Sequence, residues 1–148
     1  MKRALIALAL SCSVLSAHAV EPLTVSRLAT DKTTADAFKT MVGSQKLPEW
    51  VTQGGTTSPN QDVVIDGHKY VVLNSCKPHD CSAQSIAVLY SPESRSLAGV
   101  FSELDEQAVN QKLTWLNISD NLSIDGKTIL FAALTGSLDN HPDSFNFK

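Results

Sequence analysis

Two cysteines near the middle of the chain enclose a polar tetrapeptide whose side chains could act in catalysis, metal binding or recognition. The segment consists of Cys76, Lys77, Pro78, His79, Asp80 and Cys81. Its simplest interpretation is a disulfide that closes a tight connection between two strands, and so short a closed loop contributes only about 2 kcal/mol to stability. A disulfide explains both cysteines. It does not explain why Lys, Pro, His and Asp stand where a hairpin turn would favour Asn, Gly or Ser.

A metal site is a second interpretation of the same segment. Cys76, His79 and Cys81 are candidate ligands, and His68 is nearby in the sequence. Structural zinc sites, however, favour paired cysteine elements from two places and require reduced thiolates. A thioredoxin-like redox role is weaker still, because the spacing is Cys-x4-Cys and not Cys-x-x-Cys. A metal-binding module therefore stays an alternative, while our first expectation is a protein with no metal and no other cofactor.

The third interpretation is a rigid binding loop. A disulfide would close the loop covalently, and Pro78 would fix its own φ and restrict the conformation of Lys77. Such a loop would present His79 to a partner in one conformation. This matters because each flexible side chain that is immobilised on binding costs about 0.5–1.5 kcal/mol. A protonated imidazole has two N–H donors, so its natural target is a pair of carboxylates in a cleft.

The first 19 residues have the pattern of a cleaved export signal. A basic head, Lys2 and Arg3, precedes an uncharged apolar run at residues 4–15, and residues 17–19 form a small-x-small cleavage site. The apolar run is shorter than the roughly 20 residues that span a bilayer. We therefore expect this segment to direct export and not to remain as a membrane anchor.

Cys12 raises the alternative of a lipid anchor. Ala9 disfavours it, because a branched apolar residue is expected at that position, so we predict cleavage after Ala19. The mature domain, residues 20–148, then keeps only the two cysteines of the central segment. Two cysteines in an exported chain are typical of one disulfide. The compact bacterial type of signal places the protein in the periplasm.

Length and charge exclude several classes of protein. A chain of 148 residues that is 43% hydrophobic and 18% charged fits one globular domain, and neither a two-domain enzyme nor a disordered tail. Its net charge is −3, and removing residues 1–19 leaves ten basic against fifteen acidic residues, a net charge of −5. This balance argues against nucleic acid or an anionic membrane as a partner. The choice between a monomer and a homodimer stays open.

Hydrophobic patterns and turn signals predict a single α+β domain. We expect strands at residues 62–65, 68–73, 85–90, 97–103 and 113–116. The Asp-Gly pair between the first two strands is a strong hairpin signal. Helices are expected at residues 23–29, 33–42 and 105–111, with a helical turn at 47–51 and a loop at 54–60. The apolar stretch at residues 127–134 fits a helix or a strand, and Asp125 before it and Gly136 after it favour the helix. The tail at residues 140–148 is expected to be irregular, with Phe145 and Phe147 folded back onto the domain.

Other conspicuous side chains have simpler structural explanations. Trp50 and Trp115 could stack on sugars, but most aromatic residues at such spacings belong to a core. His68 is expected to be exposed or hydrogen-bonded. The three acidic residues within 103–106 resemble an acid–base pair, yet they also fit the start of a helix. The sequence has no Ser-His-Asp pattern and no glycine-rich phosphate loop, so we expect a protein that is not an enzyme.

The segment at residues 76–81 resembles the signature of the periplasmic inhibitors of vertebrate (C-type) lysozyme. The resemblance covers essentially the whole mature chain, through residues 46–51, 54–56, 112–117, 123–128, 131–138 and 140–143. It implies an antiparallel sheet of about five strands with helices on both faces, and a protruding disulfide loop that enters the lysozyme cleft. It also implies that His79 contacts the two catalytic carboxylates, while Lys77, Pro78 and Asp80 shape and support the loop.

The implied function agrees with the chemistry of the proposed target. A retaining glycosidase works with two carboxyl groups about 5–5.5 Å apart, one of which is kept protonated as the acid. A donor placed between them would block the sugar, and peptidoglycan would be protected. C-type lysozymes are strongly basic, which fits an acidic partner. The target itself stays open between a host lysozyme and the cell's own lytic transglycosylases.

Overall fold

A six-stranded antiparallel sheet forms the framework of the domain. The computed structural model describes residues 21–105, 107 and 109–148, so the predicted signal segment and Cys12 lie outside the described residues. The strand order is β1-β3-β4-β5-β6, and β2 pairs with β3 along the same edge as β1. The strands are β1 (Thr56–Thr57), β2 (Gln61–Ile65), β3 (His68–Cys76), β4 (Gln84–Tyr90), β5 (Leu97–Leu104) and β6 (Gln111–Leu116).

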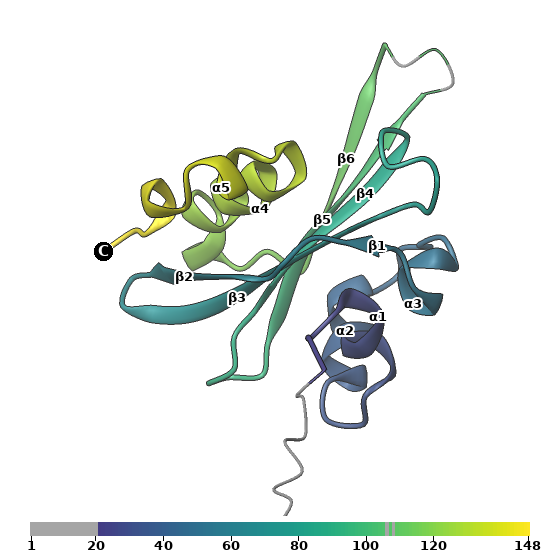
Figure 1. Cartoon of the computed structure of the whole chain (residues 1–148). Helices are drawn as coiled ribbons and strands as arrows, with labels where there is room; N and C mark the ends of the chain where they lie inside the picture. Colours follow the sequence, from purple (N-terminus) through teal and green to yellow (C-terminus); the bar gives the residue numbers. More distant parts are fainter. Residues whose placement is uncertain (1–20, 106, 108) are drawn as a thin grey trace, which may run out of the picture.

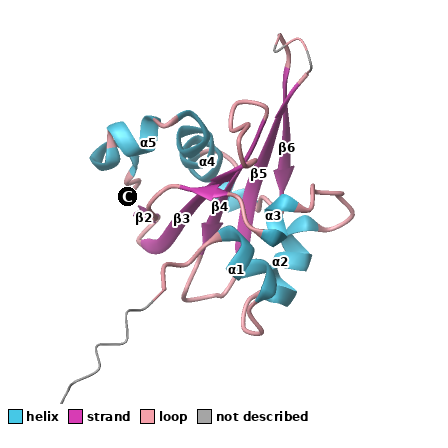
Figure 2. Ribbon diagram, turned by 45° about the vertical axis from the view of Figure 1, so that its right-hand side comes forward, coloured by secondary structure: helices cyan, strands magenta, loops and turns pink. Residues whose placement is uncertain are grey.

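Helices cover both faces of this sheet (Figures 1 and 2). One face carries α1 (Val25–Thr30), α2 (Ala35–Val42) and α3 (Trp50–Gln53), and the other carries α4 (Asp125–Thr135) and α5 (Ser137–Asn140). Two 3-10 turns complete the chain, η1 (Asp120–Leu122) and η2 (Pro142–Phe145). The predicted α+β fold with a central antiparallel sheet is confirmed.

The central strand β4 separates two hydrophobic cores. Ile86 and Val88 pack into the core beneath α1, α2 and α3, whereas Ala87 and Leu89 pack into the core beneath α4. All four side chains are at most 1% exposed. Successive side chains of a strand point to opposite faces, so a strand between two helical layers needs apolar residues at every position. The continuous apolar run of β4 is therefore a direct consequence of its place in the sheet.

The turn between β2 and β3 and the glycine that ends α4 are both found where the sequence predicts them. Asp66 and Gly67 join β2 to β3 with φ values of 49° and 78°, the positive pair that a tight hairpin turn requires. The segment at residues 127–134, which fitted a helix or a strand, is the helix α4, and it ends at Gly136 in the left-handed conformation. This helix is tied to the sheet by the side-chain amide of Asn74, which donates to the carbonyl of Ala133 at 2.6 Å.

The helix predicted at residues 105–111 is wrong. β5 and β6 are instead joined by a turn, in which the Asp105 N–H donates to the carbonyl of Asn110 at 3.0 Å. The Asp105 carboxylate accepts hydrogen bonds from the backbone N–H groups of Val109 and Asn110, at 2.9 and 3.2 Å. An acidic residue that bonds to backbone N–H groups ahead of it occurs in turns as well as at helix starts. The pairing of β6 with β5 decides between the two.

Two further segments contain short strand pairings that the sequence does not predict. The loop expected at residues 54–60 contains β1, which pairs with the last two residues of β3. In the tail, Phe147 forms a bridge to Ile65 that the sequence does not predict. The expected packing of Phe145 and Phe147 onto the domain is confirmed, since both lie against the core beneath α4. Strands of one or two residues have no periodicity of their own, so only the tertiary pairing defines them.

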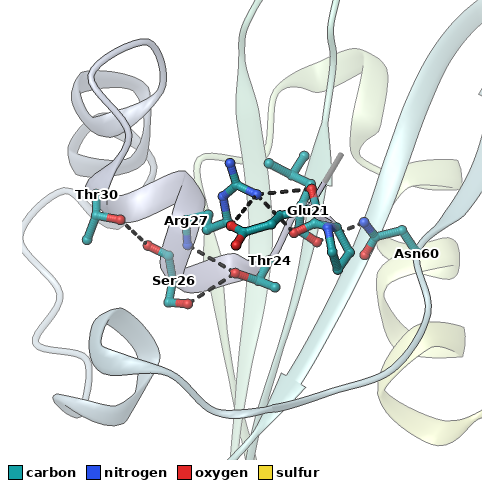
Figure 3. Close-up of polar contacts among 8 residues, drawn as sticks. Glu21, Thr24, Ser26, Arg27, Thr30 and Asn60 are labelled. Carbon is teal, nitrogen blue, oxygen red and sulfur yellow. Dashed lines mark hydrogen bonds and ion pairs between the residues drawn. The ribbon is translucent and has the colours of Figure 1, made fainter. Parts of the chain in front are cut away.

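The first described residues are fastened to the rest of the domain (Figure 3). The Arg27 guanidinium donates to the carbonyl of Glu21 at 3.0 Å and lies 3.4 Å from its carboxylate. The side-chain amide of Asn60 donates to the carbonyl of Leu23 at 2.8 Å, and Thr24 caps α1 by accepting from the Arg27 N–H. None of the helices within the described residues has the length and apolar character needed to cross a membrane.

Candidate functional site

The six-residue segment between β3 and β4 is a ring closed by a disulfide. Cys76 and Cys81 are bonded, with their Cα atoms 4.8 Å apart. Cys76 is also the last residue of β3, where it pairs with Thr56 of β1 on one side and Ser85 of β4 on the other. We call residues 76–81 the disulfide ring. It stands on a strand end that is paired on both sides, so its base is fixed by the sheet.

A β-turn lies inside the disulfide ring. The Asp80 N–H donates to the carbonyl of Lys77 at 3.0 Å, which places Pro78 and His79 at the two central positions. Pro at the first central position and a positive φ at the second are the pattern of a type II turn. His79 has a φ of 64°, in the left-handed region where glycine is usual and histidine is one of the better-tolerated exceptions. The histidine thus occupies a position that a glycine would fill more easily.

The turn exposes the imidazole and pairs the charges beside it. Of the four residues that the two cysteines enclose, His79 is exposed and the other three are partly buried. Lys77 and Asp80 are partly buried, and their charged groups form an ion pair with an Nζ to Oδ2 distance of 3.2 Å. Such a half-exposed pair contributes at most about 1 kcal/mol. Its effect is to hold the two charged side chains together and leave His79 as the exposed tip of the ring.

The left-handed backbone at residue 79 leads to a prediction about stability. We expect the His79→Gly variant to be more stable to urea unfolding than His79→Ala by about 1 kcal/mol, because an alanine Cβ is strained at this φ and glycine is not. At ordinary helix or strand positions the order is reversed. Equal stability of the two variants, or a more stable alanine variant, would show that the chain does not hold this conformation in solution.

A groove separates the disulfide ring from the turn between β5 and β6. These two connections lie at the same end of the sheet (Figures 1 and 2), and the groove runs between Lys77 and Asp80 on one side and Leu104 and Asp105 on the other. Hydrogen bonds from the Val109 N–H and the Asn110 side chain lower the pKa of Asp105. A carboxylate held in its ionised form is a poor general acid, so the acid–base interpretation of this cluster gains no support.

The structure does not bring the candidate metal ligands together as thiolates and imidazoles around one site. The disulfide removes the two thiolates on which the metal interpretation depends. His68 lies at the opposite end of β3 from the disulfide ring, and its Nδ1 atom is 3.2 Å from the Glu93 carboxylate. Across residues 21–105, 107 and 109–148, no three His, Cys, Asp or Glu side chains are gathered as metal ligands.

Both tryptophans pack against the cores. Trp50 packs with Phe101, the ring centroids being 6.3 Å apart, and its indole N–H donates to the side-chain carbonyl of Gln84 at 2.9 Å. Trp115 lies against the other core, with the ammonium group of Lys127 at 5.3 Å from its ring centroid. Gln84 carries no local sequence signal, because its contact with Trp50 joins residues 34 positions apart in the chain.

Comparison with known proteins gives a consistent result. A family model described as inhibitor of vertebrate lysozyme (Ivy) matches residues 33–130. The chain is 56% identical over 133 residues to the inhibitor of vertebrate lysozyme of Escherichia coli strain K12, covering 90% of this chain and 85% of that protein. It is 32% identical over 66 residues to the inhibitor of vertebrate lysozyme of Pseudomonas aeruginosa PAO1, covering 44% of this chain and 43% of that protein.

Proposed function

The chain belongs to the Ivy family of inhibitors of vertebrate lysozyme, and from this premise we propose how it acts. It binds a C-type lysozyme, inserts the disulfide ring into the active-site cleft, and places His79 against the two catalytic carboxyl groups. The protein is an inhibitor and not an enzyme, and its effect is to protect peptidoglycan.

The chemistry of the cleft supports this choice of contact residue. Lysozyme needs one carboxyl group protonated as the general acid and the other ionised, and the two groups lie about 5–5.5 Å apart in a retaining enzyme. An imidazole between them donates or accepts hydrogen bonds with both. It thereby occupies the space of the sugar and disturbs the separation of the two pKa values on which the reaction depends.

One observation carries the proposal. His79 is exposed at the tip of a covalently closed turn, in a backbone conformation that favours glycine. Backbone strain of this kind persists where the surrounding structure fixes it, and it is concentrated at binding and catalytic sites. The disulfide, Pro78 and the Lys77–Asp80 ion pair together fix the backbone on both sides of the histidine.

A direct assay tests the function. Purified protein lacking residues 1–19 is mixed with a C-type lysozyme, and the clearing of a peptidoglycan suspension is followed. We expect inhibition that saturates at a fixed molar ratio of inhibitor to enzyme. Undiminished clearing at a large excess of the protein would contradict the proposal. A parallel assay with a lytic transglycosylase shows whether the cell's own enzymes are targets as well.

The charge of the protein predicts how salt affects binding. Without residues 1–19 its net charge is −5, and C-type lysozymes are strongly basic. Attraction between the opposite net charges of the two proteins speeds their encounter. Raising the ionic strength from 0.05 to 0.5 M should therefore lower the association rate constant about 10-fold and change the dissociation rate constant much less. Surface plasmon resonance separates the two rates. Equal effects of salt on association and dissociation would argue against electrostatic steering.

We further propose that the protein is exported to the periplasm and that residues 1–19 are removed there. The support is the signal-like pattern of those residues together with the Cys76–Cys81 disulfide, since disulfides persist in oxidising compartments. The mass of the protein recovered from a periplasmic extract tests both points. A mass that includes residues 1–19 would contradict cleavage after Ala19.

A further inference from the structure

We propose that Trp50 and Gln84 are positioning residues, which orient the disulfide ring for binding although neither belongs to it. This inference rests on the proposed function and adds to it a brace behind the ring. The brace consists of α3, the two glycines that follow it, β1 and the side chain of Gln84. These elements lie at the end of the sheet that carries the ring (Figure 1).

Gln84 connects α3 to the first residue inside the ring. Its side-chain carbonyl accepts a hydrogen bond from the Trp50 indole N–H at 2.9 Å, and its backbone carbonyl accepts one from the Lys77 N–H at 3.0 Å. Its side-chain NH2 group is 3.4 Å from the Glu103 carboxylate. The oxygen and the nitrogen of the Gln84 side-chain amide both have partners. Gln84, whose backbone carbonyl accepts the hydrogen bond from Lys77, is therefore fixed by contacts to both Trp50 and Glu103.

Gly55 brings the same brace against the other side of the ring base. A Cβ atom at this glycine would lie 2.6 Å from the carbonyl oxygen of Cys76 and 2.9 Å from the Trp50 ring, and it would also collide with the hydroxyl of Ser75. The backbone at Gly55 thus packs directly on the strand end that carries the disulfide. Only glycine permits this approach.

The brace is expected to act on binding more than on folding. The pairing of residues 71–76 of β3 with residues 85–90 of β4 does not involve the indole bond, so we expect the sheet to form without it. Without that bond the ring base has a wider range of orientations, and only part of that range fits the cleft. The apparent affinity then falls in proportion to the fraction of molecules in the competent orientation.

The first test is the Trp50→Phe variant, which keeps an aromatic ring against Phe101 and removes the N–H donor. We expect its inhibition constant for a C-type lysozyme to rise roughly three- to tenfold, the equivalent of one hydrogen bond. The matched control is Trp115→Phe, a tryptophan on the opposite face of the sheet, which should leave inhibition unchanged. If Trp50→Phe does not fold, Gln84→Met provides a second test, because it removes the acceptor of the same hydrogen bond and should raise the inhibition constant by a similar factor.

A double-mutant cycle separates positioning from general stability. If Trp50 acts through the orientation of His79, Trp50→Phe should weaken inhibition clearly in the wild type and by less than twofold in the His79→Ala background. Additive effects in the two backgrounds, or no effect of Trp50→Phe in the wild type, would overturn the inference. Failure of the proposed function has a different signature: the wild-type protein does not inhibit lysozyme, or His79→Ala inhibits as well as the wild type.

Discussion

Replacing His79 with alanine is expected to raise the inhibition constant for a C-type lysozyme roughly 30- to 1000-fold, which corresponds to a loss of about 2–4 kcal/mol of binding free energy. The side chain is the exposed tip of the disulfide ring, and its partners in the complex are charged groups inside a cleft. Truncation leaves those groups without their hydrogen-bond partner, and a central contact of this kind is where the binding energy of an interface is concentrated. Inhibition assays over a range of inhibitor concentrations measure the change.

The chain offers a matched control histidine. His68 is exposed as well, but it lies at the far end of β3 from the ring and is paired with Glu93. His68→Ala should therefore inhibit as well as the wild type. A second variant, His79→Asn, keeps a residue that tolerates the left-handed backbone and tests the imidazole itself. Wild-type inhibition by both His79 variants would remove this residue from the mechanism.

Opening the disulfide ring is expected to have the second-largest effect. In a variant with both Cys76→Ser and Cys81→Ser the ring residues are free to move, and their order must be created during binding. Ordering costs about 0.5–1.5 kcal/mol for each flexible side chain, so we expect the inhibition constant to rise roughly 10- to 100-fold. The variant should also lose about 2 kcal/mol of stability to urea unfolding, the value for so short a closed loop.

Reduction of the wild-type protein provides an independent check. A reductant should weaken inhibition by the wild type to the level of the double serine variant, and it should leave that variant unaffected. Full inhibition by the reduced protein would show that the covalent closure is dispensable. Binding of zinc by the reduced protein with a gain of inhibition would instead support the metal alternative, in which free thiolates are the functional form.

The sequence predicted those elements whose causes are local. Asp66 and Gly67 supply the positive φ values of the β2–β3 turn, and Gly136 supplies the left-handed end of α4. The apolar run at residues 85–90 predicts the strand β4, whereas the helices on both of its faces were implied only by the family resemblance. The composition of the disulfide ring indicated a constrained loop with an exposed histidine. In each case the residues that specify the structure are neighbours in the chain.

The errors and omissions have non-local causes. Asp105 is a residue type that favours a helix start, yet its carboxylate accepts from backbone N–H groups of a turn, and that turn exists because β6 returns to pair with β5. β1 exists only because its two residues pair with the end of β3. The contact between Trp50 and Gln84 joins a helix to a strand 34 positions away. No pattern within a short window of sequence contains these pairings.

The most direct test of the mechanism is a crystal structure of the complex between the mature protein and a C-type lysozyme. We expect the disulfide ring to occupy the cleft, with an imidazole nitrogen of His79 within hydrogen-bond distance, about 2.7–3.2 Å, of a catalytic carboxyl oxygen. A complex in which the cleft is empty, or is filled by another part of the inhibitor while His79 faces solvent, would contradict it.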